Sequence, residues 1–221
     1  MLISRIRMRP DAAGDEVFRK CTDDIYAIHA QVWDLFAGTP ARNRDFLYRQ
    51  EMGQGLPAFF CISEREPHDR QGIWAIETKP YAPVVRSGQV LSFVLCANPI
   101  RAKRDENHRQ HRHDVVMEAK TRGRETMGEC PGTADIVQEE GCCWLAQKGE
   151  ANGFSICTGQ VRADGYRQLR IYKPGGDIRI STLNFTGLLT VTAPGPFLHA
   201  LFTGIGPAKG FGCGMMMIRR A

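Results

Sequence analysis

Two short segments of this sequence carry residue types that could do chemistry. In the first, Tyr26 and His29 are three residues apart, so on a helix their side chains would project from the same face. Imidazole transfers protons readily near neutral pH, and a phenol can hold or protonate an anionic oxygen. The pair therefore indicates metal-free acid–base chemistry. A histidine that is hydrogen-bonded at the margin of a core would give the same pattern.

The second segment, residues 204–214, reads GIGPAKGFGCG and contains five glycines. Glycines allow backbone amides to approach an anion closely, and Lys209 adds a positive charge. The segment follows an expected helix and precedes an expected strand, which is the reverse of a P-loop or a dinucleotide-binding fingerprint. Both a phosphate-binding loop and a plain glycine-rich turn fit this composition.

The spacing of apolar residues predicts a helix around the Tyr26 and His29 pair. Apolar residues recur at helical intervals from Ile25 to Leu35, and the pattern stops before Gly38. Thr22 is a suitable N-cap, and acidic residues follow it in the first turn, where they interact favourably with the helix dipole.

The remaining elements alternate in an order that occurs twice. Strands are expected at residues 2–8, 46–48, 58–62, 73–78, 90–97, 154–161, 169–173, 178–191 and 215–218. Further helices are expected at residues 133–148 and directly after Pro194, and a long basic loop is expected between residues 101 and 124. This order predicts an α+β fold with two tandem ferredoxin-like (β-α-β-β-α-β) domains, residues 1–86 and 87–221.

The composition excludes several classes of protein. The chain has 221 residues, of which 43% are hydrophobic and 24% charged, as in ordinary globular proteins. No apolar run approaches the roughly 20 residues that span a bilayer, and the N-terminus lacks the apolar core of a signal peptide. We therefore expect a cytoplasmic protein without a membrane partner. The eight cysteines show no C-x-x-C spacing and are expected to be free thiols.

Positive charge is concentrated at the C-terminal end. Residues 155–221 carry eight basic and two acidic residues, a net charge of +6, whereas the rest of the chain has 21 and 22, a net charge of −1. A basic end on a nearly neutral body favours a polyanion partner, with nucleic acid the first candidate. A solubilising charged surface is the alternative.

Three histidines in the basic loop have spacing that resembles a metal site. His108, His111 and His113 lie among five arginines and lysines, which would repel a divalent cation. We therefore expect no metal and no cofactor, and interpret this loop as a surface that contacts RNA phosphates.

Four blocks of the sequence resemble one known family. They are YAIHAQVWDLF at residues 26–36, RDFLYR at 44–49, ANPIR at 97–101, and GIGPAK with GCG at 204–209 and 212–214. In this order, over nearly the whole chain, they resemble the CasE family, also called Cse3. These are the CRISPR RNA-processing endoribonucleases of the type I-E Cascade complex, in the RAMP superfamily.

The resemblance implies a fold, an activity and partners. The fold would be two ferredoxin-like domains of the RAMP type. The activity would be cleavage of precursor CRISPR RNA at the 3′ base of each repeat stem-loop without metal, leaving a 5′ hydroxyl and a 2′,3′-cyclic phosphate. The partners would be the repeat hairpin and the other Cascade subunits. The family's catalytic residues correspond to Tyr26 and His29, with His29 the first candidate for the general base.

Together with this resemblance, the positive charges indicate an RNA-binding surface. Hairpin RNA is recognised largely by its shape and its phosphates. The candidate contacts are Arg101, Lys103, Arg104, Arg162, Arg167, Arg170, Lys173, Arg179, Gly204, Gly206, Lys209, Gly210 and Gly212.

Two other functions remain open at this stage. A non-catalytic RNA-binding subunit of a ribonucleoprotein would carry the same basic residues without needing Tyr26 and His29. An enzyme acting on a phosphorylated metabolite would use the glycine-rich segment, but a small ligand does not need such an extended basic surface.

Overall fold

The computed structural model describes residues 1–12, 25–36, 44–53, 55–105, 108–127, 132–173 and 176–221. The first half of the chain contains β1 (Leu2–Met8), a 3-10 turn (Pro10–Ala12), α2 (Ile25–Leu35), β2 (Phe46–Gly53), β3 (Leu56–Ser63) and β4 (Trp74–Pro80). The second half contains β5 (Val90–Ala97), β6 (Ile100–Arg104), β7 (Gln110–Asp114), α3 (Val115–Met127), α4 (Thr133–Ala151), β8 (Phe154–Lys173), β9 (Gly176–Val191), α5 (Pro194–Thr203), the 3-10 turn η2 (Lys209–Phe211) and β10 (Met216–Arg220).

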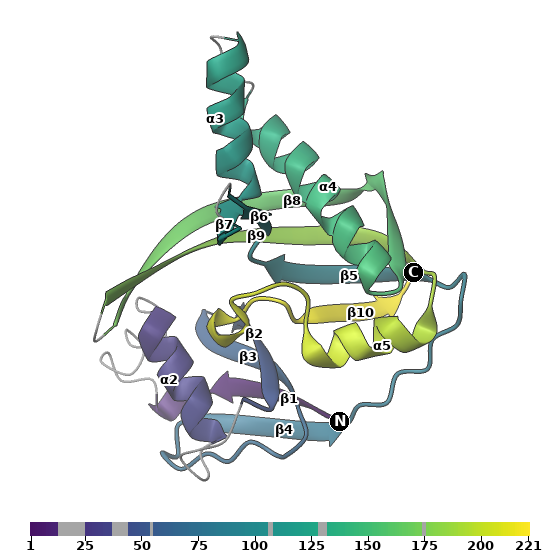
Figure 1. Ribbon diagram of the computed structural model, residues 1–221. Coiled ribbons are helices and arrows are strands. Elements are labelled where there is room, and N and C mark those ends of the chain that lie inside the picture. Colours follow the sequence, from purple (N-terminus) through teal and green to yellow (C-terminus); the bar gives the residue numbers. More distant parts are fainter. Residues whose placement is uncertain (13–24, 37–43, 54, 106–107, 128–131, 174–175) are drawn as a thin grey trace.

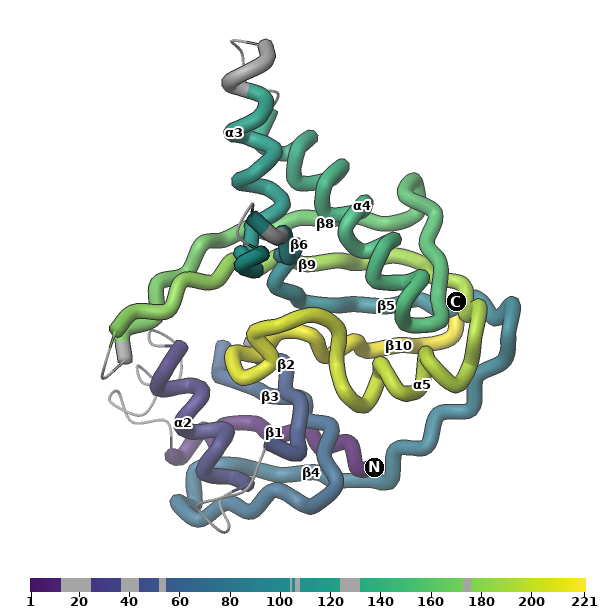
Figure 2. The backbone as a smooth tube through the Cα atoms, in the orientation of Figure 1, coloured from purple at the N-terminus to yellow at the C-terminus, as the bar shows by residue number. Residues whose placement is uncertain are grey.

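The structure contains two four-stranded antiparallel sheets, ordered β2-β3-β1-β4 and β10-β5-β9-β8 (Figure 1). In each sheet the first and third strands of the unit are central, and the second and fourth are at the edges. This is the arrangement of a ferredoxin-like fold, so the expected α+β class with tandem ferredoxin-like units is confirmed. Residues 81–89 connect the sheets along one side of the molecule (Figure 2).

Three details differ from the sequence prediction. The segment expected to be a long basic loop forms the β6–β7 hairpin and most of helix α3. β8 is one strand of 20 residues rather than two. Its pairing with β9 shifts register at two irregular points but continues beyond each of them. Between β3 and β4, residues 64–73 contain no helix, so the first unit lacks the second helix of the ferredoxin-like pattern. The expected N-cap, Thr22, lies outside the described residues.

Helix α2 packs on one face of the first sheet. Its buried side chains are Ile28, Val32 and Leu35, at the helical spacing seen in the sequence. They belong to one apolar cluster with residues of β1, β2 and β3, including Ile6 and Phe59, which are fully buried. His29 lies beside this stripe and is only half-buried, so the packing of its neighbours fixes its position.

The opposite face of the first sheet is also apolar and contacts the second half of the chain. Leu47 and Ile62 form a cluster with Met215, which directly precedes β10, and Phe202 of α5 packs against it. Because neighbouring residues of a strand point to opposite faces, β2 and β3 contribute to both clusters. This second cluster holds the two sheets together and brings the segment after α5 close to β2 (Figure 1).

Strands β8 and β9 form a long hairpin that extends beyond the second sheet and curves toward α2 (Figure 1). Asp164 pairs with Asn184 just before one register shift, and Arg167 pairs with Thr182 just after it. Irregularities of this kind bend a hairpin and change the direction of its side chains. Within the described ranges, no helix is long and apolar enough to cross a membrane, and the six described cysteines are free thiols.

We predict that Gly187→Ala destabilises the protein by about 2 kcal/mol or more. An added methyl group would overlap the backbone oxygen of Gln160 and lie 2.8 Å from Val161 Cα, at the first irregular point of the hairpin. Gly159→Ala is the matched control, because a methyl group there meets no atom within 4 Å. Urea unfolding of both variants measures the difference, and equal midpoints would contradict the prediction.

Candidate active site and nucleic-acid interface

The centre of the site is a hydrogen bond between the two halves of the chain. His29 Nδ1, on α2, lies 2.6 Å from the backbone oxygen of Gly210, in the glycine-rich segment. A carbonyl oxygen can only accept, so Nδ1 carries the proton and donates it. The neutral ring is therefore held in the tautomer in which Nε2 has a free lone pair. Any proton that His29 takes from or gives to a substrate passes through Nε2.

Tyr48 holds the same carbonyl from the second side. Its hydroxyl donates to the Gly210 oxygen at 2.9 Å, from a side chain that is almost completely buried in β2. Burial raises the pKa of Tyr48, so this phenol stays protonated and remains a donor. The Gly210 carbonyl thus receives two hydrogen bonds from the first half of the chain, which together fix its direction.

Aromatic rings surround the His29 imidazole. The ring centroids of Trp33 and Phe211 lie 5.5 Å and 5.4 Å from that of His29, and Tyr26 is at 6.2 Å. Tyr26 and His29 therefore share one side of α2, as their spacing predicts. Tyr26 is 38% exposed, so a ligand that reaches His29 can also contact this residue.

One cation, Arg44, lies close to Gly210, and a second, Lys209, directly precedes it in the chain. A methyl group added to Gly210 would be 3.3 Å from Arg44 Nη1 and 3.6 Å from His29 Cε1, so the guanidinium and the imidazole border one point. Desolvation lowers the pKa of Arg44, and desolvation together with the charge of Arg44 lowers the pKa of Lys209. Two half-buried cations that repel one another form a site that an anion would stabilise.

The glycine-rich segment is anchored by backbone hydrogen bonds. Ile205 N donates to Gly214 O at 2.9 Å, and Gly214 N donates to the oxygen of Cys96 in β5 at 2.7 Å. Gly212 has a φ of 78°, and a methyl group there would lie 3.3 Å from the Tyr48 ring. Glycine at this position permits both the left-handed backbone and the close approach to Tyr48.

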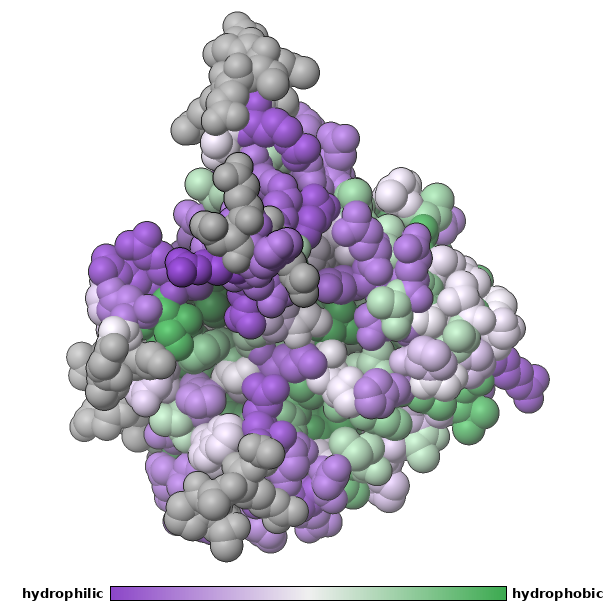
Figure 3. Space-filling model, in the orientation of Figure 1, coloured by the Kyte–Doolittle hydropathy of each residue, from purple (hydrophilic) through white to green (hydrophobic). Residues whose placement is uncertain are grey.

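A cavity of about 710 Å³ lies between the β8–β9 hairpin, the start of β6, the end of β7 and the glycine-rich segment. Arg112, Arg170 and Arg179 line it together with one carboxylate, Asp114, so the lining carries a net positive charge. Two further lining groups, Asn98 Oδ1 and Ser181 Oγ, are buried without a hydrogen-bond partner among the described residues. Buried polar groups are normally paired, so these two atoms indicate a ligand with complementary hydrogen-bonding groups. Figure 3 shows hydrophilic residues gathered over the β6–β7 hairpin and the outer β8–β9 hairpin.

The predicted RNA-binding arginines and lysines do not all reach this cavity. Arg170 and Arg179 line it, although Arg170 also donates to Asp177 at 2.6 Å. Arg162 is paired with Asp164 at 2.6 Å, and Arg167 lines a separate, smaller hollow. Arg101 lies on β6, opposite His113.

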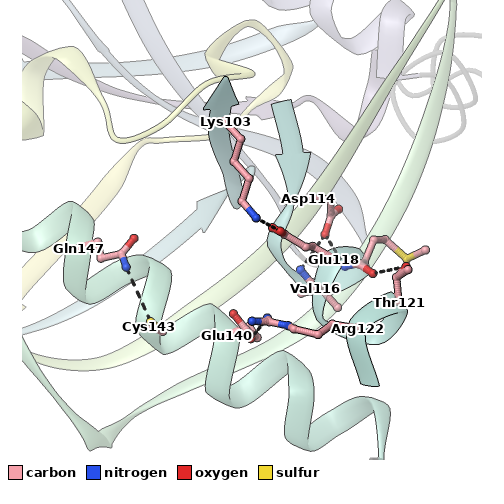
Figure 4. Close-up of polar contacts among 10 residues, drawn as sticks. Lys103, Asp114, Val116, Glu118, Thr121, Arg122, Glu140, Cys143 and Gln147 are labelled. Atoms are coloured by element: carbon pink, nitrogen blue, oxygen red, sulfur yellow. Dashed lines mark hydrogen bonds and ion pairs between the residues drawn. The ribbon is translucent and has the colours of Figure 1, made fainter. Parts of the chain in front are cut away.

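Lys103 points away from the cavity, toward helix α3. It forms an ion pair with Glu118, which holds the pKa of that carboxyl below its usual range (Figure 4). Its charge is thus partly neutralised within the protein. Arg104 and Lys173 lie on β6 and β8, and both side chains fall outside the described part of the structure.

The predicted glycine contacts are distributed along the segment between α5 and β10. Gly204 ends α5, and Gly206 packs against the ring of Trp144, so both shape the backbone of the loop. Gly210 lies close to His29 of α2, and Gly212 lies close to the Tyr48 ring of β2. The segment therefore contacts α2 and β2 directly, as well as bordering the basic cavity.

The three histidines of the expected basic loop lie on or beside the β6–β7 hairpin. His111 Nε2 is 2.8 Å from the Asp105 carboxylate, and all three histidine side chains are exposed. Across the described ranges, no three or more His, Cys, Asp or Glu side chains are grouped so that they could hold a metal ion.

Four residues of the site were not individually assigned a role from the sequence: Arg44, Tyr48, Arg112 and Phe211. Arg44 and Tyr48 belong to the RDFLYR block, whose alternation could have shown that both side chains point to the face covered by α2. Phe211 sits between two glycines, an unusual place for a ring that only packs in a core. Arg112 belongs to the basic segment that was expected to contact RNA phosphates, but it was not singled out, because its strand was interpreted as a loop.

Comparison with known proteins gives consistent results. The CasE subunit of the CRISPR system Cascade from Escherichia coli is 26% identical over 204 residues, covering 91% of this chain and 95% of the relative. The CRISPR-associated endoribonuclease Cse3 of Thermus thermophilus is 27% identical over 188 residues, 78% of each chain. A structure of Thermus thermophilus Cse3 bound to an RNA representing a pre-cleavage complex superimposes with a TM-score of 0.72 at 22% identity, covering 99% of this chain and 98% of that one. A family model described as CRISPR-associated protein matches residues 1–220, and the chain therefore belongs to this CRISPR-associated family.

Proposed function

We propose that this protein is a metal-independent endoribonuclease that binds the stem-loop of a CRISPR repeat and cuts at the 3′ base of the stem. The observation that carries the proposal is the His29 hydrogen bond to Gly210, which leaves Nε2 as the proton acceptor in a site that also holds the charges of Arg44 and Lys209. The similarity to CasE and to the Cse3 endoribonuclease supports the choice of substrate.

The arrangement suits attack by the 2′ hydroxyl of the nucleotide before the cut. His29 Nε2 accepts the proton of that hydroxyl, and the oxygen forms a bond to the adjacent phosphorus. The bond to the 5′ oxygen of the next nucleotide breaks, and that oxygen takes up a proton from solvent water. The products are a 2′,3′-cyclic phosphate and a 5′ hydroxyl. Tyr26, on the same side of α2, positions or protonates the phosphate.

Arg44 and Lys209 would stabilise the extra negative charge on the phosphate during attack. Both are half-buried, so their charges are less screened than those of exposed side chains. Burial lowers both pKa values, and a phosphate bound between the two side chains would raise them, because a nearby negative charge favours the protonated forms. Such prearranged positive groups are a large part of enzymatic stabilisation of a developing anion.

The basic cavity is the proposed contact for the RNA stem. Arg112, Arg170 and Arg179 come from two different hairpins, so a duplex that touches all three would have a defined orientation. The sheet unit of residues 1–86 then supplies the catalytic helix, and residues 87–221 supply the stem surface and the Gly210 carbonyl. We expect the cut RNA to remain bound in a Cascade-type complex, in the cytoplasm.

A cleavage assay tests the proposal directly. In excess EDTA, the protein should cut its host's CRISPR repeat RNA once, and it should not cut the same RNA with a 2′-deoxy sugar at the cut nucleotide. The reaction needs the 2′ hydroxyl and no divalent ion. Equal cutting of both RNAs would disprove 2′ hydroxyl attack. Tight binding without any cutting would show a non-catalytic RNA-binding subunit instead.

We predict that His29→Ala abolishes cleavage and leaves hairpin affinity within a few fold. The proton acceptor is lost, whereas the stem surface lies on other elements. His199→Ala is the control, because this exposed histidine lies on α5. Single-turnover rates and filter-binding affinities are the measurements. A large loss of affinity in His29→Ala would indicate a binding role for His29.

We predict that Arg44→Met and Lys209→Met each slow cleavage by about tenfold to a hundredfold, mainly in kcat. Lys79→Met, an exposed lysine at the end of β4, should have no effect. Because the pKa of Lys209 is lowered, its charge and the activity are lost at a lower pH than for an ordinary lysine. Lys209→Arg should therefore move the alkaline limb of the pH–rate profile upward. An unchanged limb would exclude Lys209 from the rate-limiting step.

A further inference from the structure

A second hollow lies beside the catalytic helix and is not used by the mechanism above. It has a volume of about 260 Å³ and lies between α2, β2 and the inner face of the β8–β9 hairpin. Residues that characterise its lining are Ile28, Arg49, Arg167, Thr182, Asn184 and Phe211. In Figure 3 hydrophobic residues are exposed in the recess beneath the outer β8–β9 hairpin.

Arg49 indicates that this hollow receives a ligand. Its Nε donates to Glu51 at 3.0 Å, but its Nη1 is buried and has no partner among the described residues. A buried N–H group without an acceptor is unfavourable, so a bound acceptor would stabilise the site. The pKa of Cys96, which also lines the hollow, is lowered chiefly by a hydrogen bond with the Cys213 thiol and further by the charges of Arg49 and Arg167, so both guanidinium groups lie near this space.

The position of Phe211 shows where the hollow lies relative to the proposed cut. Its side chain borders both the hollow and the large basic cavity, and its ring centroid is 5.4 Å from that of His29. Leu169 of β8 also borders both spaces. A strand of RNA that leaves the basic cavity past His29 would therefore meet Phe211 before it enters the hollow.

The chemistry of the hollow matches one unpaired nucleotide. An aromatic ring offers a stacking surface for any base, and the Asn184 amide and Thr182 hydroxyl can pair with base edges. Two arginines suit a phosphate or a base oxygen. The volume is just below the roughly 300–1,000 Å³ of sites for drug-sized ligands, which is too small for a base pair.

We propose that this hollow binds the first nucleotide on the 3′ side of the cut, and that Phe211 separates it from the stem in the basic cavity. The inference rests on the proposed function. Unstacking this nucleotide turns the chain at the scissile phosphate, and holding it fixes the 5′ oxygen that leaves. Binding energy from a flanking nucleotide would thus be used to orient the reacting bond.

An abasic substitution tests the inference. RNA that lacks only the base 3′ of the cut should bind to, and be cut by, the unchanged protein about tenfold less well, as for a lost stacking contact. In Phe211→Leu and Arg49→Met, removing the base should reduce binding and cleavage by about twofold or less, because the site for the base is already impaired. We call this reduction the abasic penalty. Phe211→Tyr keeps a ring and should retain the full penalty. RNA that is abasic three nucleotides further along should show no penalty.

Affinity is measured with the uncleavable 2′-deoxy RNA and rate with the cleavable RNA. Arg220→Met, which removes an exposed charge at the end of β10 and outside the lining of the hollow, is the control for loss of charge. Melting temperatures identify a variant that fails to fold, in which case the other variant decides. An absent penalty in the unchanged protein, or a full penalty in both Phe211→Leu and Arg49→Met, would overturn the inference. Binding without cleavage would refute the proposed function alone, since the affinity measurements would still test the hollow.

Discussion

The hydrogen bond from His29 to the Gly210 carbonyl joins the two halves of the protein at the point where chemistry is proposed. The histidine comes from the helix that covers the first sheet, and the carbonyl comes from the loop before the last strand of the second. Neither half contains the site by itself. Tyr48 donates to the same oxygen, so its direction is set by two donors whose own positions depend on the first apolar core.

The glycine-rich loop has two physical roles in this arrangement. Its backbone must pass close to the rings of His29 and Tyr48, where a side chain at Gly210 or Gly212 would be crowded. It must also carry Lys209 to the space beside Arg44, where two cations are partly desolvated. A loop that presents a carbonyl to a histidine and a cation to an anion needs little side-chain bulk, which explains why glycine alternates with other residues here.

The basic residues of residues 87–221 are used unevenly. Arg162 and Arg170 have acidic partners within the same hairpin, and Lys103 is paired with a helix of its own half. Arg112 and Arg179 line the basic cavity, and Arg167 faces the smaller hollow. Net charge over a segment therefore indicated a polyanion, but the geometry of strands and ion pairs decides which cations face a ligand.

The sequence alone determined features that depend on local periodicity and residue chemistry. Helix α2 could be predicted because apolar residues repeat at its buried face. The succession of strands along the chain could be predicted from short apolar runs separated by turns. The β6–β7 hairpin was missed because its residues are mostly charged and carry little apolar alternation. Its pairing is decided by contacts with neighbouring elements rather than by its own pattern.

The site itself was only partly accessible from the sequence. Tyr26 and His29 are close in the chain, so helical spacing was enough to place them on one face. Gly210 is 181 residues from His29, and the tautomer of the imidazole depends on that distant carbonyl. Arg49, Arg167 and Phe211 come from three separate elements and meet only because the sheets pack face to face. Local spacing in the sequence indicates which residues share a helix or strand, whereas packing between these elements decides which residues share a site.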